Sequence, residues 1–522
     1  MLIKGGTIID GTGKNKFIGD VRFDGELIKE IGESLKPQRG ENVLDATGKF
    51  VTPGFIDIAN RSDTFFSIIL RPSLSSLVKQ GVTTIIGGIC GASLAPLASK
   101  EAILAIQKWQ NISGLNINWV TTGEFLAEIE SRDIAINFGT MTGHGTLRRG
   151  LVGDSFGPLS PEEMKKMEYL LERSISEGSF GMSTGLAYSH EKVALFNELV
   201  VLAKLLKNKN CFYATHLRDE GENLLVSVNE VISLSREAEL PCHVYHFKSA
   251  GKNFWGQFKN ALEMIDSANS SGADINFDVY PYSSTATVLY LLLPDWVSSD
   301  GKAKVLMRLK NKYIRERIVE EMKGKEDSIK DIIIAKGGVS NINTGRSISE
   351  VARASECSVT DALLNILIAS NDRIIGFIPS IDDINVENAI SNKHSIIASD
   401  GAGYSMKDGK SGMLVHPRSF GAFTKFLGDF VRNKQLLSWE EGIRKITSFP
   451  AEKIGLAKRG QLKKGYFADI IIFDPEKISD RATFRDPFKY SEGVDYVFVN
   501  GGLALRNGKF QKKRHGKVLR KA

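Results

Sequence analysis

The sequence predicts an α/β fold, in which a (β/α)8 TIM barrel is joined to a small β-sandwich domain built from both chain ends. Three observations favour this fold. Short apolar runs separated by Gly and Asp turns fill residues 1–50, and the same pattern returns near the C-terminus. Between them, apolar strands, polar loops and amphipathic helices follow one another repeatedly, which is typical of parallel α/β barrels.

The two chain ends predict one small domain. The N-terminal runs LIKGGTIID and DVRFDGELIKEIG and the C-terminal runs GYFADIIIFDP and VDYVFVNGGLALRNGKF have strand character, and an Asn-Gly turn divides the last of them. We therefore assign the small domain to 1–52 and 456–512, and the barrel to 53–455. The remaining residues, 513–522, form a basic tail that we expect to be a solvated end.

Nine segments between the two ends have the character of barrel strands and their ends. They are FIDIANRSD, TTIIGGICG, INFGTMTGHG, SFGMSTGL, CFYATHLRD, CHVYHFK, INFDVYPY, RIIGFIPS and SIIASDG. Because a barrel holds one fewer, we remove RIIGFIPS, which follows a long, polar, Lys-rich stretch. We expect that stretch to belong to an insertion, at about 285–350, that covers the mouth of the barrel.

The composition limits the class of protein. With 522 residues, 42% of them hydrophobic and 25% charged, the chain suits one large and one small globular domain. The net charge of +7 is spread along the chain, so we expect no nucleic-acid partner. Four cysteines do not make a disulfide framework in a chain of this length. Without a signal peptide or an apolar run of ~20 residues, we expect a cytoplasmic protein with no membrane partner.

Residues able to do chemistry follow several predicted strands, at the end of a barrel that carries the active site. Cys90, His216, His246 and Asp400 lie there, and the two histidines are one βα repeat apart. A thiolate and two imidazoles leave one position of a zinc ion open for water, which is the arrangement of catalytic zinc. Asp400 is then a candidate general base.

Each of these residues also has a structural interpretation. A buried Cys is commonly a small apolar residue, a His at a strand end commonly makes hydrogen bonds, and an Asp before Gly commonly makes a turn. The joint placement of the four residues favours the zinc site. For His144, in the run GHG, we expect only a structural hydrogen bond.

Longer motifs add a family resemblance. The runs GICGASLAPL, MTGHGTLRRGLVG, GMSTGLAYSH, YATHLRDEGENLL, HVYHFKSAG, DVYPY, ASDG, HPRSFGAF and AKRGQLKKGYFADIIIFDP resemble the N-acyl-D-amino-acid deacylases, or D-aminoacylases, of the amidohydrolase superfamily. The likeness covers nearly the whole chain. It implies the barrel of the metal-dependent hydrolases and an enzyme that hydrolyses carbon–nitrogen amide bonds.

The resemblance also implies site residues. Cys90, His216 and His246 match the tight zinc ligands of the family, and Asp400 matches its catalytic aspartate. The mechanism implied is attack by zinc-bound hydroxide on the acyl carbonyl, with Asp400 as the proton shuttle.

The substrate carboxylate has its own candidates. Lys248 and either Tyr280 or Tyr282 match the region of the family that holds it. Arg418 is a further candidate on chemical grounds, because a guanidinium fork suits a carboxylate. A residue that only braces a loop is the alternative for Arg418.

The run VTPGFIDIANRSD departs from the family. Its strand normally continues into His-x-His, which belongs to a weaker second metal position, but Ala59 and Arg61 stand there. We therefore expect one zinc per chain. We expect Arg61 to point into the vacant space and to pair with Asp63, Asp400 or a substrate anion, and the alternative is an Arg turned outward to the barrel rim.

The function predicted is zinc-dependent hydrolysis of N-acyl-D-amino acids, which releases a carboxylate and a D-amino acid. Because the His-x-His pair is replaced, the alternative is a catalytically impaired or repurposed relative with a binding or scaffold role. A cyclic-amide hydrolase of the dihydroorotase or hydantoinase type fits less well, since the strand ends offer no lysine to bridge two metals. The expected partner is a small-molecule substrate, and the sequence leaves a homo-oligomer open.

Overall fold

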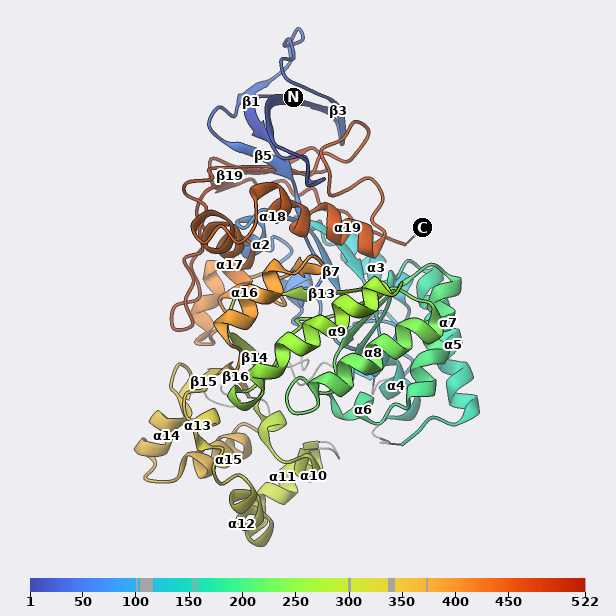
Figure 1. Ribbon diagram of the computed structural model, residues 1–522, viewed down its shortest axis with the longest axis vertical. Coiled ribbons are helices and arrows are strands. Elements are labelled where there is room, and N and C mark those ends of the chain that lie inside the picture. Colours follow the sequence, from blue (N-terminus) through green and yellow to red (C-terminus); the bar gives the residue numbers. More distant parts are fainter. Residues whose placement is uncertain are drawn as a thin grey trace.

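The fold is described from a computed structural model of the chain, over residues 1–99, 102–103, 116–153, 155, 157–298, 302–336, 343–371 and 374–521. Within those ranges, no helix is long and apolar enough to cross a membrane. A small β domain, a central barrel and a lobe of short helices follow one another along the longest axis of the molecule (Figure 1).

Parallel strands form the barrel in the centre of the molecule. They are β6 (Phe55–Asp57), β7 (Val82–Gly87), β8 (Asn137–Thr140) with its continuation β9 (Thr142–Gly143), β10 (Gly181–Gly185), β11 (Phe212–His216), β12 (Cys242–Val244), β13 (Ile275–Val279) and β17 (Ser395–Ile397). They run as β6-β7-β8 and as β9-β10-β11-β12-β13-β17. Strands such as β7 are buried along their whole length, as expected where helices cover the outside of a parallel sheet.

The first and last strands close the barrel. Asn60 and Gly401, which follow β6 and β17, form a parallel bridge, and the amide of Arg61 donates to the carbonyl of Gly401 at 2.7 Å. On the opposite side, the amide of Phe180 donates to the carbonyl of Thr140 at 3.0 Å and so joins β10 to β8. The predicted α/β barrel is therefore confirmed, and its closing seam lies next to Asp400.

Helices surround the barrel. They are α1 (Ser67–Leu70), α2 (Ser75–Val78), α3 (Thr122–Glu130), α4 (His144–Val152), α5 (Pro161–Ser176), α6 (Ser189–Lys192), α7 (Phe196–Asn208), α8 (Leu224–Ala238), α9 (Phe258–Ser270), α16 (Asp383–Ser391), α17 (Arg418–Lys425), α18 (Trp439–Ile446) and α19 (Ser448–Ile454). Their starts follow local rules: Ser160 and Glu163 form a capping box on α5, and Pro161 takes its first position.

Both chain ends meet in one sheet, at the top of Figure 1. Its strands are β1 (Leu2–Ile8), β2 (Phe17–Asp24), β3 (Leu27–Gly32), β4 (Val43–Asp45), β5 (Phe50–Pro53), β18 (Ile470–Phe473), β19 (Val494–Val499), β20 (Gly502–Arg506) and β21 (Lys509–Phe510). Antiparallel pairing of β5 with β18 joins the two ends. Asn500 and Gly501 turn the chain between β19 and β20 with φ values of 48° and 74°, as a tight hairpin requires.

A separate lobe leaves the barrel between β13 and β17. Strands β14 (Ser284–Val288), β16 (Ile375–Pro379) and β15 (Ile333–Lys336) form an antiparallel sheet, so the strand in RIIGFIPS lies outside the barrel, as predicted. The lobe helices are α10 (Asp295–Ser298), α11 (Lys302–Lys310), α12 (Lys312–Glu321), α13 (Glu326–Ile329), α14 (Ile348–Ala354) and α15 (Val359–Ala369). The lobe has its own apolar core. The domain limits drawn from the sequence stay a prediction.

The C-terminal tail keeps basic side chains exposed, such as Lys513, Lys517 and Arg520, but its backbone is not a free end. The amide of Phe138 in β8 donates to the carbonyl of Lys517 at 2.9 Å, and the amide of Leu519 donates back to the carbonyl of Phe138 at 2.7 Å. The physical reason lies in the barrel, because β10 pairs with β9 and is joined to β8 only through the amide of Phe180. The polar edge of β8 therefore needs another partner, and the tail supplies it.

Candidate active site

A cysteine and two histidines converge at the C-terminal end of the barrel. Cys90 follows β7, His216 ends β11 and His246 follows β12, and one potential ligand atom from each lies within 4.8 Å of the others. Cys90 Sγ is 3.3 Å from His246 Nε2. The structure thus brings together the three residues that the sequence selected as metal ligands.

The backbone is strained at this site. Cys90, His246 and Asp400 have φ values of 51°, 39° and 45°, a left-handed conformation that side chains other than glycine seldom adopt. Such strain persists where surrounding contacts over-determine it, and it gathers at functional sites. It turns these three side chains toward one point at the ends of their strands.

Buried carboxylates hold the strained segments in place. Asp63 accepts from the amide of Gly88 at 2.6 Å, just before Cys90, and Asp278 accepts from the amide of His246 at 2.9 Å. Asp57 accepts from the amide of Ser399 at 2.9 Å. Burial raises the pKa of Asp57 and of Asp63 to about 6. The sequence analysis did not predict this role, although Asp57 and Asp63 flank the departure from His-x-His.

Asp400 lies between two guanidinium groups. Arg61 Nε donates to Asp400 Oδ1 at 2.6 Å, and Arg418 forms an ion pair with Asp400 Oδ2 at 2.8 Å. Burial raises the pKa of Asp400, but the charges of Arg418 and Arg61 outweigh burial and hold this pKa well below its usual range. The Arg418 guanidinium also lies 4.6 Å from the ring centre of Tyr280.

Arg61 is an interior residue. Only 4% of it is exposed, and its Nη2 donates to Cys90 Sγ at 3.3 Å. The alternative of an arginine turned to the barrel rim is therefore wrong. Of the acids named from the sequence as partners, Asp400 makes the ion pair.

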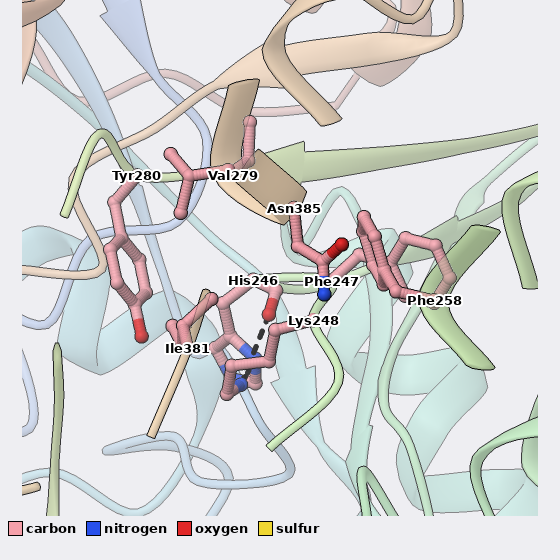
Figure 2. A pocket seen from close by; sticks show the side chains of 9 residues that line it. His246, Phe247, Lys248, Phe258, Val279, Tyr280, Ile381 and Asn385 are labelled. Carbon is pink, nitrogen blue, oxygen red and sulfur yellow. Dashed lines mark hydrogen bonds between the residues drawn. The ribbon is translucent and has the colours of Figure 1, made fainter. Parts of the chain in front are cut away.

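A second carboxylate lies on the other side of the histidines. Glu220 Oε1 is 3.1 Å from His246 Nδ1 and accepts from Lys248 Nζ at 2.5 Å, and Glu220 Oε2 is 3.7 Å from His216 Nε2. Figure 2 shows Lys248 hydrogen-bonded to His246, with Tyr280 lining the same pocket. Sequence reasoning missed Glu220, and the signal available was its place four residues after His216.

The two tyrosines differ in position. Tyr280 lines the pocket of His246 and Lys248. The hydroxyl of Tyr282 instead donates to Asp480 Oδ2 at 3.2 Å, outside the cluster. Of the two alternatives left by the sequence, only Tyr280 lies beside the proposed carboxylate-binding residues.

His144 has the structural role expected of it. Its Nδ1 is 3.0 Å from Glu191, and its Nε2 is 2.8 Å from Glu198, which also pairs with Arg148. Burial lowers the pKa of His144, but hydrogen bonds to the two glutamates outweigh burial and raise this pKa. The Glu191 carboxylate packs against Gly91, next to Cys90, where an added Cβ would lie 2.0 Å from it. The network of His144 and the two glutamates therefore packs against the turn that contains Cys90.

A cavity of about 50 Å³ lies beside Asp400, Arg61 and Arg418. Most of its remaining wall is apolar and comes partly from the antiparallel sheet of the lobe. The apolar lining residues are Phe65, Ala286, Ala335, Ile375, Phe377, Ala402, Met413, Leu414 and Val415. The lobe therefore shapes the space next to the charged residues.

The residues of the cluster fit a zinc ion. Sulfur and imidazole nitrogen are typical zinc donors, and three protein ligands leave a fourth position open. In the described part of the chain, the buried Nδ1 of His216 has no hydrogen-bond partner. Burial also lowers the pKa of His216 well below its usual value, which favours the neutral imidazole that binds metal.

Comparisons with known proteins give relatives that cover nearly the whole chain. Residues 411–504 match the model of the family described as Amidohydrolase family. N-acyl-D-glutamate deacylase of Alcaligenes xylosoxydans xylosoxydans is 30% identical, over 100% of this chain and 96% of that protein. D-aminoacylase of the same organism is 29% identical, over 99% of this chain and 97% of that protein.

Solved structures give the same result. The N-acyl-D-glutamate deacylase of Bordetella bronchiseptica, complexed with zinc and a phosphonate inhibitor, matches with a TM-score of 0.83 and 27% identity, over 100% of this chain and 99% of that one. D-hydantoinase from Thermus sp. shares the fold alone, with a TM-score of 0.57 and 15% identity over 100% of this chain and 98% of that one.

Fold and site define an amidohydrolase, a hydrolase that acts on amide bonds. Within that class, the chain belongs to the family of N-acyl-D-amino-acid deacylases, or D-aminoacylases.

Proposed function

We propose that this protein hydrolyses the amide bond of N-acyl-D-amino acids with one zinc ion held by Cys90, His216 and His246. The proposal rests on one observation, the convergence of these three side chains beside Asp400 in a barrel of the deacylase family. Zinc in such a site acidifies a bound water and polarises a carbonyl oxygen.

The chain's own residues position the substrate. Arg418 and Lys248 are the cations for its α-carboxylate, and the ring of Tyr280 lies against Arg418. Within the described residues, the buried Nε of Arg418 has no hydrogen-bond partner, so it is a donor available to a carboxylate. Holding the carboxylate fixes the amide relative to the metal ligands.

Asp400 handles the proton. It accepts the proton of the attacking water and gives it to the departing amine. In the structure Arg418 engages its Oδ2. A substrate carboxylate that draws Arg418 away frees this oxygen, so the base becomes available when the substrate is in place.

The cavity sets the class of substrate. Its walls beyond Asp400 are largely apolar, and its two arginines, Arg61 and Arg418, both pair with Asp400. An acidic side chain would lie there without a partner cation, which is costly in a buried site. We therefore propose D-amino acids with apolar side chains as substrates.

A second candidate is a catalytically impaired relative with a binding role. It is favoured by the two ion pairs of Asp400, since a carboxylate with both oxygens engaged is a weak base.

Elemental analysis and an assay of N-acetyl-D-amino acids separate the two candidates. We expect about one zinc per chain and release of amino acid from D-Met, D-Leu and D-Phe derivatives, but little from D-Asp, D-Glu or any L derivative. Metal binding without turnover of any derivative would support the impaired relative. Protein without metal at saturating zinc would overturn both.

A further inference from the structure

We propose that Arg61 is a fixed cation that takes the place of a second metal ion. It is a positioning residue that holds Asp400 and Cys90 relative to each other, and it limits the site to a single metal. The expected effect of Arg61 on turnover rests on the proposed function. Its expected effect on the number of metal ions bound does not.

The backbone of Arg61 is fixed at the closing seam of the barrel. Its amide donates to the carbonyl of Gly401 at 2.7 Å, and its own carbonyl accepts from the amide of Phe65 at 2.9 Å. Gly401 directly follows Asp400, so the hydrogen bond that closes the barrel also sets Arg61 beside that carboxylate. The side chain therefore starts from a position that the fold itself determines.

The guanidinium then bridges two groups from opposite sides of the site. Its Nε donates to Asp400 Oδ1 at 2.6 Å and its Nη2 to Cys90 Sγ at 3.3 Å. Two contacts from one planar group fix both its place and its orientation. The guanidinium therefore places a positive charge between a carboxylate and a sulfur, at the position where the His-x-His pair is replaced.

The charges of the site leave no place for a second ion. Arg61, Arg418 and Lys248 bring three positive charges, which Asp400, Glu220 and a Cys90 thiolate balance. One divalent ion on the cysteine and histidines adds two more positive charges beside these three cations. A second ion would lie against the guanidinium of Arg61 and be repelled by it.

Neighbouring side chains also offer the second ion no ligands. Ala59, the other replaced position, is fully buried and has no donor atom. Asp63 uses its two oxygens for the amides of Thr64 and Gly88. The carboxylate of Asp63 therefore holds backbone, and the carboxylate of Asp400 holds Arg61 and Arg418.

Five proteins test the inference: the natural protein, Arg61→Ala, Arg61→Lys, Ala59→His, and Ala59→His combined with Arg61→His. Ala59→His restores one ligand but keeps the Arg61 cation, so it should stay at one metal. Arg71→Ala is the matched control, because Arg71 lies ten residues after Arg61, is partly exposed, and pairs with Asp408 rather than with Asp400 or Cys90. Cobalt(II) titration measures the metals bound, since a cobalt–thiolate band reports the site of Cys90 and elemental analysis reports the total.

We expect the natural protein and the control to saturate at one cobalt, and the double histidine variant to take up a second. Arg61→Ala should keep one cobalt, lose about ten- to a thousandfold in kcat and change KM much less, because positioning acts on the reaction step. Added guanidinium should restore part of that loss, and Arg61→Lys should lie between the natural protein and Arg61→Ala.

Two metals in the natural protein, or unchanged kcat in folded Arg61→Ala, would overturn the inference. If the natural protein hydrolyses none of the substrates, the proposed function fails, while the metal count still decides the role of Arg61. If Arg61→Ala does not fold, Arg61→Lys and the double histidine variant decide the question, because both keep a polar side chain at this position.

Discussion

Glu220→Gln tests the carboxylate behind the two histidines. This change keeps the shape of the side chain but removes the charge that three groups share, at 2.5 Å from Lys248, 3.1 Å from His246 and 3.7 Å from His216. A carboxylate behind a histidine ligand orients the ring and raises its basicity, and its loss typically lowers metal affinity about 10- to 100-fold. At about 1.4 kcal/mol per factor of ten, this is about 1.4–3 kcal/mol of binding free energy.

Lys248 adds a second effect in the same variant. Its amine is buried and would lose the 2.5 Å contact with Glu220, so it is expected to favour any other anion in reach. We therefore expect Glu220→Gln to bind zinc more weakly. Its KM for the substrate should also rise, but by a smaller factor than the loss of zinc affinity.

The assay is competition for zinc against a chelator of known affinity. Glu222→Gln is the control, since Glu222 is exposed and lies two residues away in the same loop. Equal zinc affinity in Glu220→Gln and Glu222→Gln would refute the reasoning and show that the histidines are oriented by other contacts.

The remaining predictions concern proton transfer, the carboxylate site and stability. Asp400→Asn should keep zinc but lose about two to four orders of magnitude in rate, which stopped assays with elemental analysis would check. Tyr280→Phe should raise KM, by up to about 10- to 100-fold if its hydroxyl binds the substrate carboxylate, while Tyr282→Phe should leave KM unchanged, since its hydroxyl serves Asp480. His144→Gln should cost about 3–5 kcal/mol of unfolding free energy at pH 6 and less at pH 9. Its folded pKa is raised, so its stabilisation is present below the unfolded pKa and lost as pH rises through the folded one. His394→Gln, whose pKa burial lowers, should not show that trend in chemical unfolding.

The sequence predicted the features that depend on the spacing of apolar residues and on the order of strands and helices along the chain. The strands of the barrel follow from apolar runs, and Cys90, His216 and His246 were found because parallel strands bring their ends together. The sequence left two directions open for Arg61, into the site or out to the barrel rim, and only its burial in the structure decides between them. Its partner also stayed open, because the choice between Asp63 and Asp400 depends on how the barrel closes.

Other features depend on contacts that no local pattern encodes. Glu220 stands among Asp219 and Glu222 in one short loop, and these three acids look alike until the fold turns one of them toward His246. The tail packs on β8 because the barrel leaves that edge open, which is a property of strand pairing and not of the tail's own basic sequence.

The ion pair of Arg61 with Asp400 at the barrel seam also has a consequence for the order in which the site residues are synthesised. These partners lie 339 residues apart, whereas Cys90 and His246 lie 156 apart. A ribosome therefore releases the whole cysteine and histidine set long before the aspartate emerges. Until then the nascent chain holds Arg61 without its counter-ion, so β17 brings the last strand of the barrel and the Asp400 carboxylate together.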